Sequence, residues 1–327
     1  MDYSVIIPIY NEEENIHLLY ERLTGVMNQL GGTAEYLFVN DGSVDKSIDL
    51  IKGLSAQNSN VRYIDFSRNF GHQIAVSAGL DYCVGKRVVI IDADLQDPPE
   101  LILDMAKKMD EGFEVVYAQR RSRKGESIFK KLTASAFYKI LSSITSIDIP
   151  LNTGDFRMMD FRIVEVLREM PEKNKFLRGQ ISWIGFRQTY VEFDRDERHA
   201  GETGYPFKKM LRFAIDGITA FSDAPLKFVF GMGVFVFILT LLLIIYTIVS
   251  WLFFESTVQG WSSIMISILF IGGVQMIGIG IIGEYISRIG NNVKERPLYI
   301  VRSTSTPLSD RPSASASIKE ENNSESA

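Results

Sequence analysis

Two long uncharged segments near the C-terminus constrain the fold of this chain more than any other feature. Residues 228–254 and 261–282 contain no Asp, Glu, Lys or Arg. As helices they would be about 40 Å and about 33 Å long, and each exceeds the ~20 residues that cross the hydrocarbon core of a bilayer. Only residues 255–260 separate them. We therefore predict a transmembrane hairpin over residues 227–285.

Basic residues flank this hairpin on both sides. Those before it are Lys208, Lys209, Arg212 and Lys227, and those after it are Arg288, Lys294, Arg296 and Arg302. Since Lys and Arg collect on the cytoplasmic side of membrane spans, both ends of the hairpin are expected in the cytoplasm. The chain is therefore predicted to be a multi-pass protein of the cell (inner or plasma) membrane, with residues 1–205 as a cytoplasmic domain.

The segments beside the hairpin differ in composition. Residues 206–226 carry apolar side chains at helical spacing, with basic residues on the other side, which predicts an amphipathic helix in the membrane interface. The alternative is a core helix of the soluble domain. Residues 286–302 are expected to form a cytoplasmic juxtamembrane segment. Residues 303–327 are rich in Ser, Pro and Glu and are predicted to be a disordered tail.

The N-terminal domain alternates apolar runs with helical patterns. Strands are predicted at residues 4–10, 35–40, 61–67, 87–92 and 113–118, and helices near 12–30, 45–57, 72–84 and 99–111. This alternation is typical of an α/β fold with a mostly parallel sheet covered on both faces. Ligands of such sheets bind at the carboxyl ends of the strands. The polar clusters of this chain follow the predicted strands, so we expect its site at that edge.

Composition and missing motifs exclude several classes of function. Charged residues make up 23% of the chain and its net charge is −5, so no basic surface of the kind that binds nucleic acid is expected. The chain has neither a G-x-x-x-x-G-K-[ST] loop nor a G-x-G-x-x-G after its first strand, which disfavours ATPases and dinucleotide-dependent enzymes. The single cysteine, Cys83, cannot form an internal disulfide and is interpreted as a small core residue.

The stretch "VVIIDADLQDPPE", residues 88–100, runs from a buried strand directly into Asp92, Asp94 and Asp97. Neighbouring carboxylates repel one another unless a positive charge lies between them, and an oxygen-rich Asp-x-Asp pair suits Mg²⁺ or Mn²⁺. The alternative is a solvated turn. Asp97 is interpreted as the cap of a helix opened by Pro98 and Pro99.

Five motifs, in order along the chain, give a specific resemblance. They are "VIIPIYNEEENI", "FVNDGSVDKS", "FSRNFGHQIAVSAGLDYCVG", "IDADLQDPPE" and "NTGDFRMMD". With the C-terminal hairpin, they resemble family-2 glycosyltransferases that act on polyprenyl phosphates, such as bactoprenol glucosyltransferases and dolichol-phosphate mannose synthases. The similarity covers about residues 3–302. It implies a GT-A fold (Rossmann-like), a nucleotide-diphosphate sugar donor, Mg²⁺ or Mn²⁺, and a polyprenyl-phosphate acceptor in the membrane.

The resemblance also implies residue roles. Metal ligands are expected at Asp94 and Gln96, with Asp92 holding either the metal or the ribose. The expected nucleotide pocket comprises Pro8, Tyr10, Asn11, Glu12, Asp41, which would contact the base, and Ser67. Tyr10 has a structural alternative, packing at the end of a strand. Ser67, with Arg68, has another, capping the helix that follows Gly71.

Asp155 in "TGDFR" is the predicted catalytic residue, with a turn-stabilising Asp as the alternative. Because the second pKa of a phosphate is near 6, the acceptor is largely ionised at neutral pH and hardly requires a strong base; Asp155 would either orient it or remove a residual proton. Phosphate contacts are predicted for Arg157, Arg120 and Arg121. The alternative for residues 120–124 is a solvated basic loop near anionic lipid.

One departure from the family pattern concerns the acceptor site. Relatives commonly carry a Gly-x-Ser-Lys-type stretch before the amphipathic helix, and Gly204 occupies the lysine position here. Either Lys208 or Lys209, or alternatively Arg195 and Arg198, would then contact the phosphate. His199 is interpreted as a surface residue.

The sequence therefore predicts an inverting, metal-dependent transfer of one sugar from a nucleotide-diphosphate sugar to polyprenyl (undecaprenyl) phosphate, for cell-envelope glycosylation. UDP-glucose or UDP-N-acetylglucosamine is the preferred donor. A flippase and a second glycosyltransferase are expected as later partners, and a homo-oligomer (tetramer or dimer) is expected. The alternatives are a GDP-mannose-using polyprenyl-phosphate mannosyltransferase, a processive or protein-directed family-2 transferase, and a catalytically silent nucleotide-sugar-binding scaffold.

Overall fold

The computed structural model describes residues 1–121, 153–173, 175–194, 224–254, 260–294 and 296–305. The chain divides into two compact units, one formed by the N-terminal domain with the segment from Arg296 onward, and the other by residues 207–295 with a short insert. Most of the predicted amphipathic helix, residues 206–226, lies outside the described residues. So do Arg195, Arg198, His199, Gly204, Lys208, Lys209 and the tail from residue 306.

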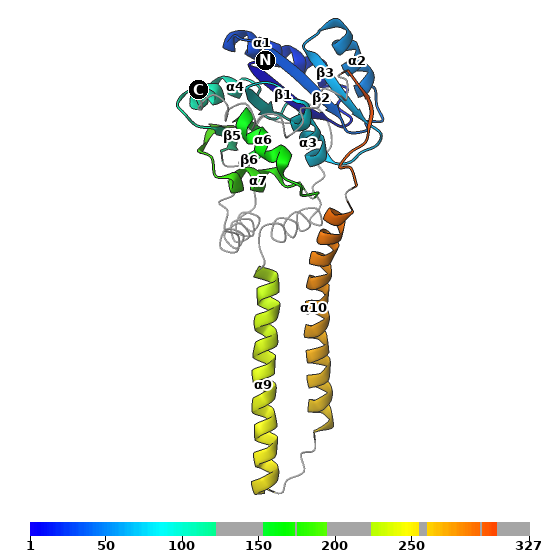
Figure 1. The fold of residues 1–327 in the computed structure, drawn as a ribbon, viewed down its shortest axis with the longest axis vertical. Helices are drawn as coiled ribbons and strands as arrows, with labels where there is room; N and C mark the ends of the chain where they lie inside the picture. Colours follow the sequence, from blue (N-terminus) through cyan, green and yellow to red (C-terminus); the bar gives the residue numbers. More distant parts are fainter. Residues whose placement is uncertain (122–152, 174, 195–223, 255–259, 295, 306–327) are drawn as a thin grey trace, which may run out of the picture. The chain divides into compact units, whose positions relative to one another are not determined.

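The first unit contains an eight-stranded sheet in the order β7-β5-β6-β4-β1-β2-β3-β8 (Figure 1). Its parallel centre comprises β1 (Tyr3–Ile9), β2 (Ala34–Asn40), β3 (Val61–Phe66) and β4 (Arg87–Ile90). β6 (Thr153–Asp160) runs antiparallel between β4 and β5 (Val115–Arg120), and β7 (Gln188–Phe193) is parallel to β5. β8 (Val301–Thr304) closes the β3 edge in antiparallel pairing.

Helices cover both faces of this sheet. Successive strand side chains point to opposite faces, so Val5 and Ile7 of β1 join one core cluster while Ile6 joins the other. The first cluster includes side chains of α1 (Ile16–Leu30), α2 (Ser47–Gln57) and α4 (Leu101–Asp110). The second includes α3 (His72–Tyr82), α6 (Phe161–Glu169) and α7 (Leu177–Ile184). The predicted α/β class with a mostly parallel sheet is confirmed.

The C-terminal segment adds a strand that the sequence did not predict. Ser303 and Thr304 belong to β8, although they open the stretch for which disorder was expected. The strand forms because β3 would otherwise be an edge strand with unpaired backbone N–H and C=O groups. Thr304 lies opposite Ile64, and Ser303 lies opposite Asp65.

The second unit contains two long helices, α9 (Ala224–Phe254) and α10 (Trp261–Val293), which contain the predicted spans. They contact each other where a Cβ added at Gly278 would lie 3.0 Å from Val229. Large apolar side chains such as Phe230 and Ile277 are exposed on them. Within the described residues, the segment Phe270–Val293 is long and apolar enough to cross a membrane.

Candidate active site

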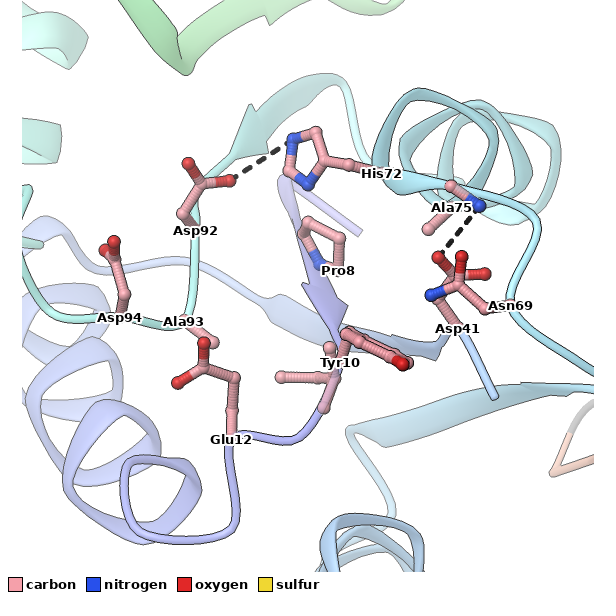
Figure 2. A pocket seen from close by; sticks show the side chains of 12 residues that line it. Pro8, Tyr10, Glu12, Asp41, Asn69, His72, Ala75, Asp92, Ala93 and Asp94 are labelled. Carbon is pink, nitrogen blue, oxygen red and sulfur yellow. Dashed lines mark hydrogen bonds and ion pairs between the residues drawn. The ribbon is translucent and has the colours of Figure 1, made fainter. Parts of the chain in front are cut away.

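A cavity of about 250 Å³ lies at the carboxyl ends of β1, β2 and β4, beside the first turn of α3 (Figure 2). Six of the predicted site residues line it, namely Pro8, Tyr10, Glu12, Asp41, Asp92 and Asp94. Asn69 and His72, for which the sequence analysis proposed no role, line it as well. The site therefore lies at the sheet edge where the sequence placed it.

The loops after β1 and β2 hold each other in place. Asn11 adopts a left-handed backbone conformation with φ of 57°, which Asn tolerates better than most residues. Its backbone N–H donates to Ser43 Oγ at 3.0 Å, and its side-chain oxygen accepts from the Val44 N–H at 2.9 Å. Asn11 thus joins two loops and does not itself line the cavity.

Asp41 shapes the cavity through the loop that follows β3. Its carboxylate accepts hydrogen bonds from the backbone N–H groups of Phe70 at 2.6 Å and Gly71 at 2.9 Å. Burial raises the pKa of Asp41, and these two N–H groups oppose that effect. The predicted base-binding residue is therefore also the anchor of the loop that carries Asn69 and His72 into the cavity.

Gly42 allows this loop to approach. Its φ is 68°, and a Cβ there would lie 2.5 Å from the backbone nitrogen of Asn69. Gly42→Ala is expected to destabilise the fold by about 1–3 kcal/mol and to weaken binding of the nucleotide that the sequence predicts for this site, because backbone must move beside the cavity. Thermal unfolding and nucleotide titration would measure both effects. Gly25→Ala is the matched control, since its Cβ meets no atom within 4 Å and it lies in α1. Equal behaviour of the two variants would contradict the prediction.

Asp92 and Asp94 follow β4 and point into the cavity (Figure 2). Asp92 Oδ1 lies 3.4 Å from His72 Nε2 and is a buried atom that accepts no hydrogen bond from the described residues. Burial raises the pKa of Asp92 to about 6, against the lowering effect of His72. Asp94 Oδ1 accepts the Gln96 backbone N–H at 3.2 Å. Gln96 itself is buried and lies outside the cavity lining.

This donor set fits a hard divalent cation that also binds a substrate. No group of three or more His, Cys, Asp and Glu side chains that could hold a metal occurs in the described part of the chain. Mg²⁺ is commonly held by one or two carboxylates, with substrate phosphates and water supplying the other ligands. Two cavity carboxylates, one of which has a buried oxygen that accepts no hydrogen bond from the described residues, match that arrangement.

Asp97 does not cap a helix as predicted. α4 begins later, at Leu101, with Glu100 as its N-terminal flanking residue. The Asp97 carboxylate instead lies 3.4 Å from Arg120 Nη2, and its side chain is almost fully buried. Pro98 and Pro99 form a turn ahead of the helix, which leaves Asp97 facing β5.

Asp155 on β6 is surrounded by three side-chain partners from two other helices, α3 and α7. Its Oδ2 lies 3.0 Å from His72 Nε2 and 2.9 Å from Gln73 Nε2, and its Oδ1 accepts from Arg178 Nε at 2.9 Å. Burial alone would raise the pKa of Asp155, but Arg178, His72 and Arg157 hold it well below its usual range. Asp155 is therefore an anionic centre for a cluster of positive groups.

His72 connects Asp155 to the carboxylates of the cavity. Burial alone would lower its pKa, but Asp92 and Asp155 raise it to about 9. Its imidazole therefore carries a proton at neutral pH and bridges the two acidic side chains. Figure 2 shows the ring facing Asp92 across the cavity.

The predicted phosphate-binding arginines that the structure describes lie outside the cavity lining. Arg157 is buried, and its guanidinium donates to the backbone carbonyls of Asp155 and Gly154, both at 3.1 Å. Burial lowers the pKa of Arg157 to about 10. Arg120 contacts Asp97, and Arg121 is paired at the surface with Glu192 at 3.2 Å. Ser67 uses its backbone to bind the C-terminal segment.

Sequence reasoning missed His72, Gln73 and Arg178 as members of the site. His72 and Gln73 stand within the motif "FSRNFGHQIAVSAGLDYCVG", where they could have been singled out as adjacent polar residues at the start of the helix that follows Gly71. Arg178 lies 23 residues after Asp155 in "FLRGQ", with no local pattern that marks it.

Comparison with known proteins identifies the family. Residues 4–168 match glycosyl transferase family 2, and residues 224–289 match the GtrB C-terminal hairpin. The chain belongs to glycosyltransferase family 2. It is 52% identical to the uncharacterized glycosyltransferase YkcC of Bacillus subtilis (strain 168), over 92% of this chain and 94% of that protein. It is 40% identical to the bactoprenol glucosyl transferase of Shigella phage SfII, over 92% and 98% respectively.

The two family matches together cover the residues that line the cavity, from Pro8 to Asp94, and most of the two helices of the hairpin. The matched family region contains β1 to β6, apart from the first residue of β1, and therefore Asp41, Asp92, Asp94 and Asp155. The hairpin match contains almost all of α9 and α10. The protein is thus a glycosyltransferase with a GT-A-like catalytic domain and a C-terminal helical hairpin.

Proposed function

We propose that this glycosyltransferase moves one sugar from a UDP-sugar to polyprenyl phosphate. Its similarity to proteins named bactoprenol glucosyl transferases, which extends over almost the whole chain, supports this acceptor. The observation that carries the proposal is the juxtaposition of a carboxylate pair with a cationic cluster, because the reaction joins two phosphorylated substrates. Asp92 and Asp94 lie on one side, and His72 links Asp92 to Asp155, which in turn binds Arg178 on the other.

Asp92 and Asp94 would hold Mg²⁺ or Mn²⁺, and Gln96 supports Asp94 through its backbone N–H. When bound, the cation would neutralise the charge that develops on the departing nucleoside diphosphate. Tyr10, whose side chain is half exposed at the cavity, would stack on the base, with Pro8 and Asp41 beside it. Glu12 would stay near the cation, on the opposite side of the cavity from Asp41.

On the acceptor side, Asp155 would act by orientation and not by taking a proton. Its pKa is held well below the usual range and its oxygens accept from His72, Gln73 and Arg178, so it is a poor base. The acceptor phosphate, with a second pKa near 6, is already a competent nucleophile. Asp155 would fix His72 and the partly exposed Arg178, whose positive charges would receive that phosphate.

The proposed reaction is a single displacement. A phosphate oxygen of the lipid attacks the anomeric carbon from the face opposite the nucleotide, a C–O bond to the lipid phosphate forms, and the C–O bond to the diphosphate breaks. The electron pair of that bond leaves with the nucleoside diphosphate, so the configuration inverts. No proton needs to move, which agrees with the weakly basic state of Asp155.

The hairpin would anchor this enzyme in the cell membrane, with the catalytic domain on the cytoplasmic side. The exposed apolar surfaces of α9 and α10 support lipid as their surroundings, and the flanking basic residues support the orientation. A flippase and a second transferase would then use the lipid-linked sugar for envelope glycosylation. Self-association into a dimer or tetramer is part of the same proposal.

Cysteine labelling tests this topology. With an impermeant thiol reagent on intact cells, Ser256→Cys between the helices is expected to react and Val44→Cys to stay unlabelled. Val44 is 86% exposed, so protection from the reagent there would show that the membrane separates this residue from the reagent, and not that the side chain is buried. The native Cys83 gives a silent background, because it is buried and burial raises its pKa to about 12. If Val44→Cys were labelled in intact cells and Ser256→Cys were protected, the orientation of the hairpin would be the opposite of the one proposed.

The function itself is tested by incubating membranes that contain the full chain with labelled UDP- and GDP-sugars and then extracting lipid. Label from a UDP-hexose in the lipid fraction is the expected result, released by mild acid as the free sugar. Label from GDP-mannose alone would establish the mannosyltransferase alternative. Nucleotide binding with no transfer from any donor would favour the silent scaffold.

A further inference from the structure

The loop that carries Asn69 and His72 into the cavity has a second attachment besides Asp41. At the start of this loop, the Ser67 backbone N–H donates to the Ile300 carbonyl at 2.9 Å. The Ser67 carbonyl accepts from Arg302 Nη2 at 2.6 Å. Both backbone groups of Ser67 are therefore bound by the segment that contains β8, the part of the chain that follows α10.

An aromatic contact reinforces this attachment. The Tyr299 ring stacks on Phe66 with centroids 5.0 Å apart and an interplanar angle of 20°. Phe66 in turn meets Phe70 edge to face at 5.6 Å. Tyr299 also donates its hydroxyl to Asp81 Oδ2 at 2.7 Å, which fixes the ring against α3. Three aromatic rings thus connect the C-terminal segment to Phe70, whose N–H binds Asp41.

We propose that Tyr299 and Arg302 are positioning residues of the donor site, acting through the loop from Ser67 to His72. Neither residue lines the cavity. They would act because the loop is held on one side by Asp41 and on the other by the C-terminal segment, so both attachments define where Asn69 and His72 stand. This inference rests on the proposed function, since the cavity is taken as the nucleotide-sugar site.

The arrangement has a thermodynamic consequence. A ligand that binds only the ordered loop also stabilises the docked C-terminal segment, because coupling between two sites is reciprocal. UDP bound in the cavity should therefore slow hydrogen exchange at the Ser67 amide, which donates to Ile300. Conversely, loss of the contacts between the C-terminal segment and the loop should weaken UDP binding by the same coupling free energy.

The experiment compares variants of the full chain, purified in detergent, by titration with UDP in the presence of Mn²⁺. Tyr299→Ala removes the stacked ring and the hydroxyl and is expected to raise the Kd for UDP about tenfold. Tyr299→Phe keeps the ring on Phe66 and is expected to stay within about twofold of wild type. Arg302→Ala, which removes only the bond to the Ser67 carbonyl, is expected to raise Kd about threefold. Ile300→Ala is the matched control, because this side chain is 54% exposed and the segment uses only its carbonyl.

The outcomes separate positioning from general stability. If Tyr299 has a purely structural role, Tyr299→Ala will have a lower melting temperature and a smaller fraction of protein that binds UDP, but the Kd of the folded molecules will be unchanged. That result overturns the inference. If Tyr299→Ala does not fold, Arg302→Ala decides by the same criterion, since Arg302 is exposed. A wild-type chain that binds neither UDP nor GDP would overturn the proposed function and this inference with it. Wild-type affinity in both Tyr299→Ala and Arg302→Ala overturns the inference alone.

Discussion

Asp155→Asn is expected to lower kcat for sugar transfer by ~10²–10⁴-fold, the range for positioned acid–base groups, with the KM for the donor almost unchanged. The amide keeps one oxygen as an acceptor but loses the negative charge. Arg178 and His72 then lie beside a neutral group, so their orientation toward the acceptor phosphate is no longer fixed. The donor contacts come from other strand ends, which separates the two effects.

The pH dependence distinguishes orientation from proton removal. Because the pKa of Asp155 is held well below its usual range, the carboxylate stays ionised across the neutral range and takes no proton from the acceptor. Raising the pH is therefore not expected to rescue Asp155→Asn. Rescue at high pH would show that Asp155 removes a proton after all.

Asp160→Asn is the matched control for this variant. Asp160 ends the same strand, and its side chain caps α6 by accepting the Arg162 N–H at 2.9 Å. Asn and Asp are equally good caps, so activity and stability should stay near wild type. Wild-type turnover in Asp155→Asn would refute the assigned role. Donor affinity lost together with turnover would move Asp155 into the nucleotide or metal site.

Asp94→Asn is expected to reduce transfer by ~10³-fold or more, since a metal ion contributes several kcal/mol to stabilising developing charge and each 1.36 kcal/mol is tenfold in rate. The fold should be retained, because Asp94 is partly exposed and the Asn oxygen can still accept the Gln96 N–H. Treatment of the wild type with EDTA should produce the same loss, reversed by Mg²⁺ or Mn²⁺. Lipid-linked product and the melting temperature are the two readouts.

Asp104→Asn controls for the loss of an acidic residue nearby. Asp104 is exposed on α4 and pairs with Lys107 at 2.8 Å, a surface ion pair of the kind that contributes little to stability. Full activity in EDTA, or in Asp94→Asn, would falsify the metal role of the carboxylate pair. Loss in Asp104→Asn as well would point to a general effect of charge.

The sequence by itself determined the main helices and strands and the acidic residues that follow the carboxyl end of β4. Hydrophobic periodicity is a local property, so β1 to β5, the helices between them and the hairpin follow from neighbouring residues. The carboxylates Asp92 and Asp94 follow β4 for the same reason, and a parallel sheet places such strand ends on one edge. The motifs around them were sufficient to identify the family.

Tertiary structure alone decided which of these groups meet. His72 and Asp155 are 83 residues apart in the chain and become neighbours because α3 begins at the edge where β6 starts. Arg178 reaches Asp155 from α7, whereas Arg157, adjacent in the motif, turns inward to backbone carbonyls. β8 docks on β3 because an open sheet edge has unpaired backbone groups, a property of the assembled sheet and not of residues 301–304. Which side chains meet depends on how the strands are aligned with one another and on how closely loops such as the one after β3 approach. Neither property can be read from neighbouring residues in the sequence.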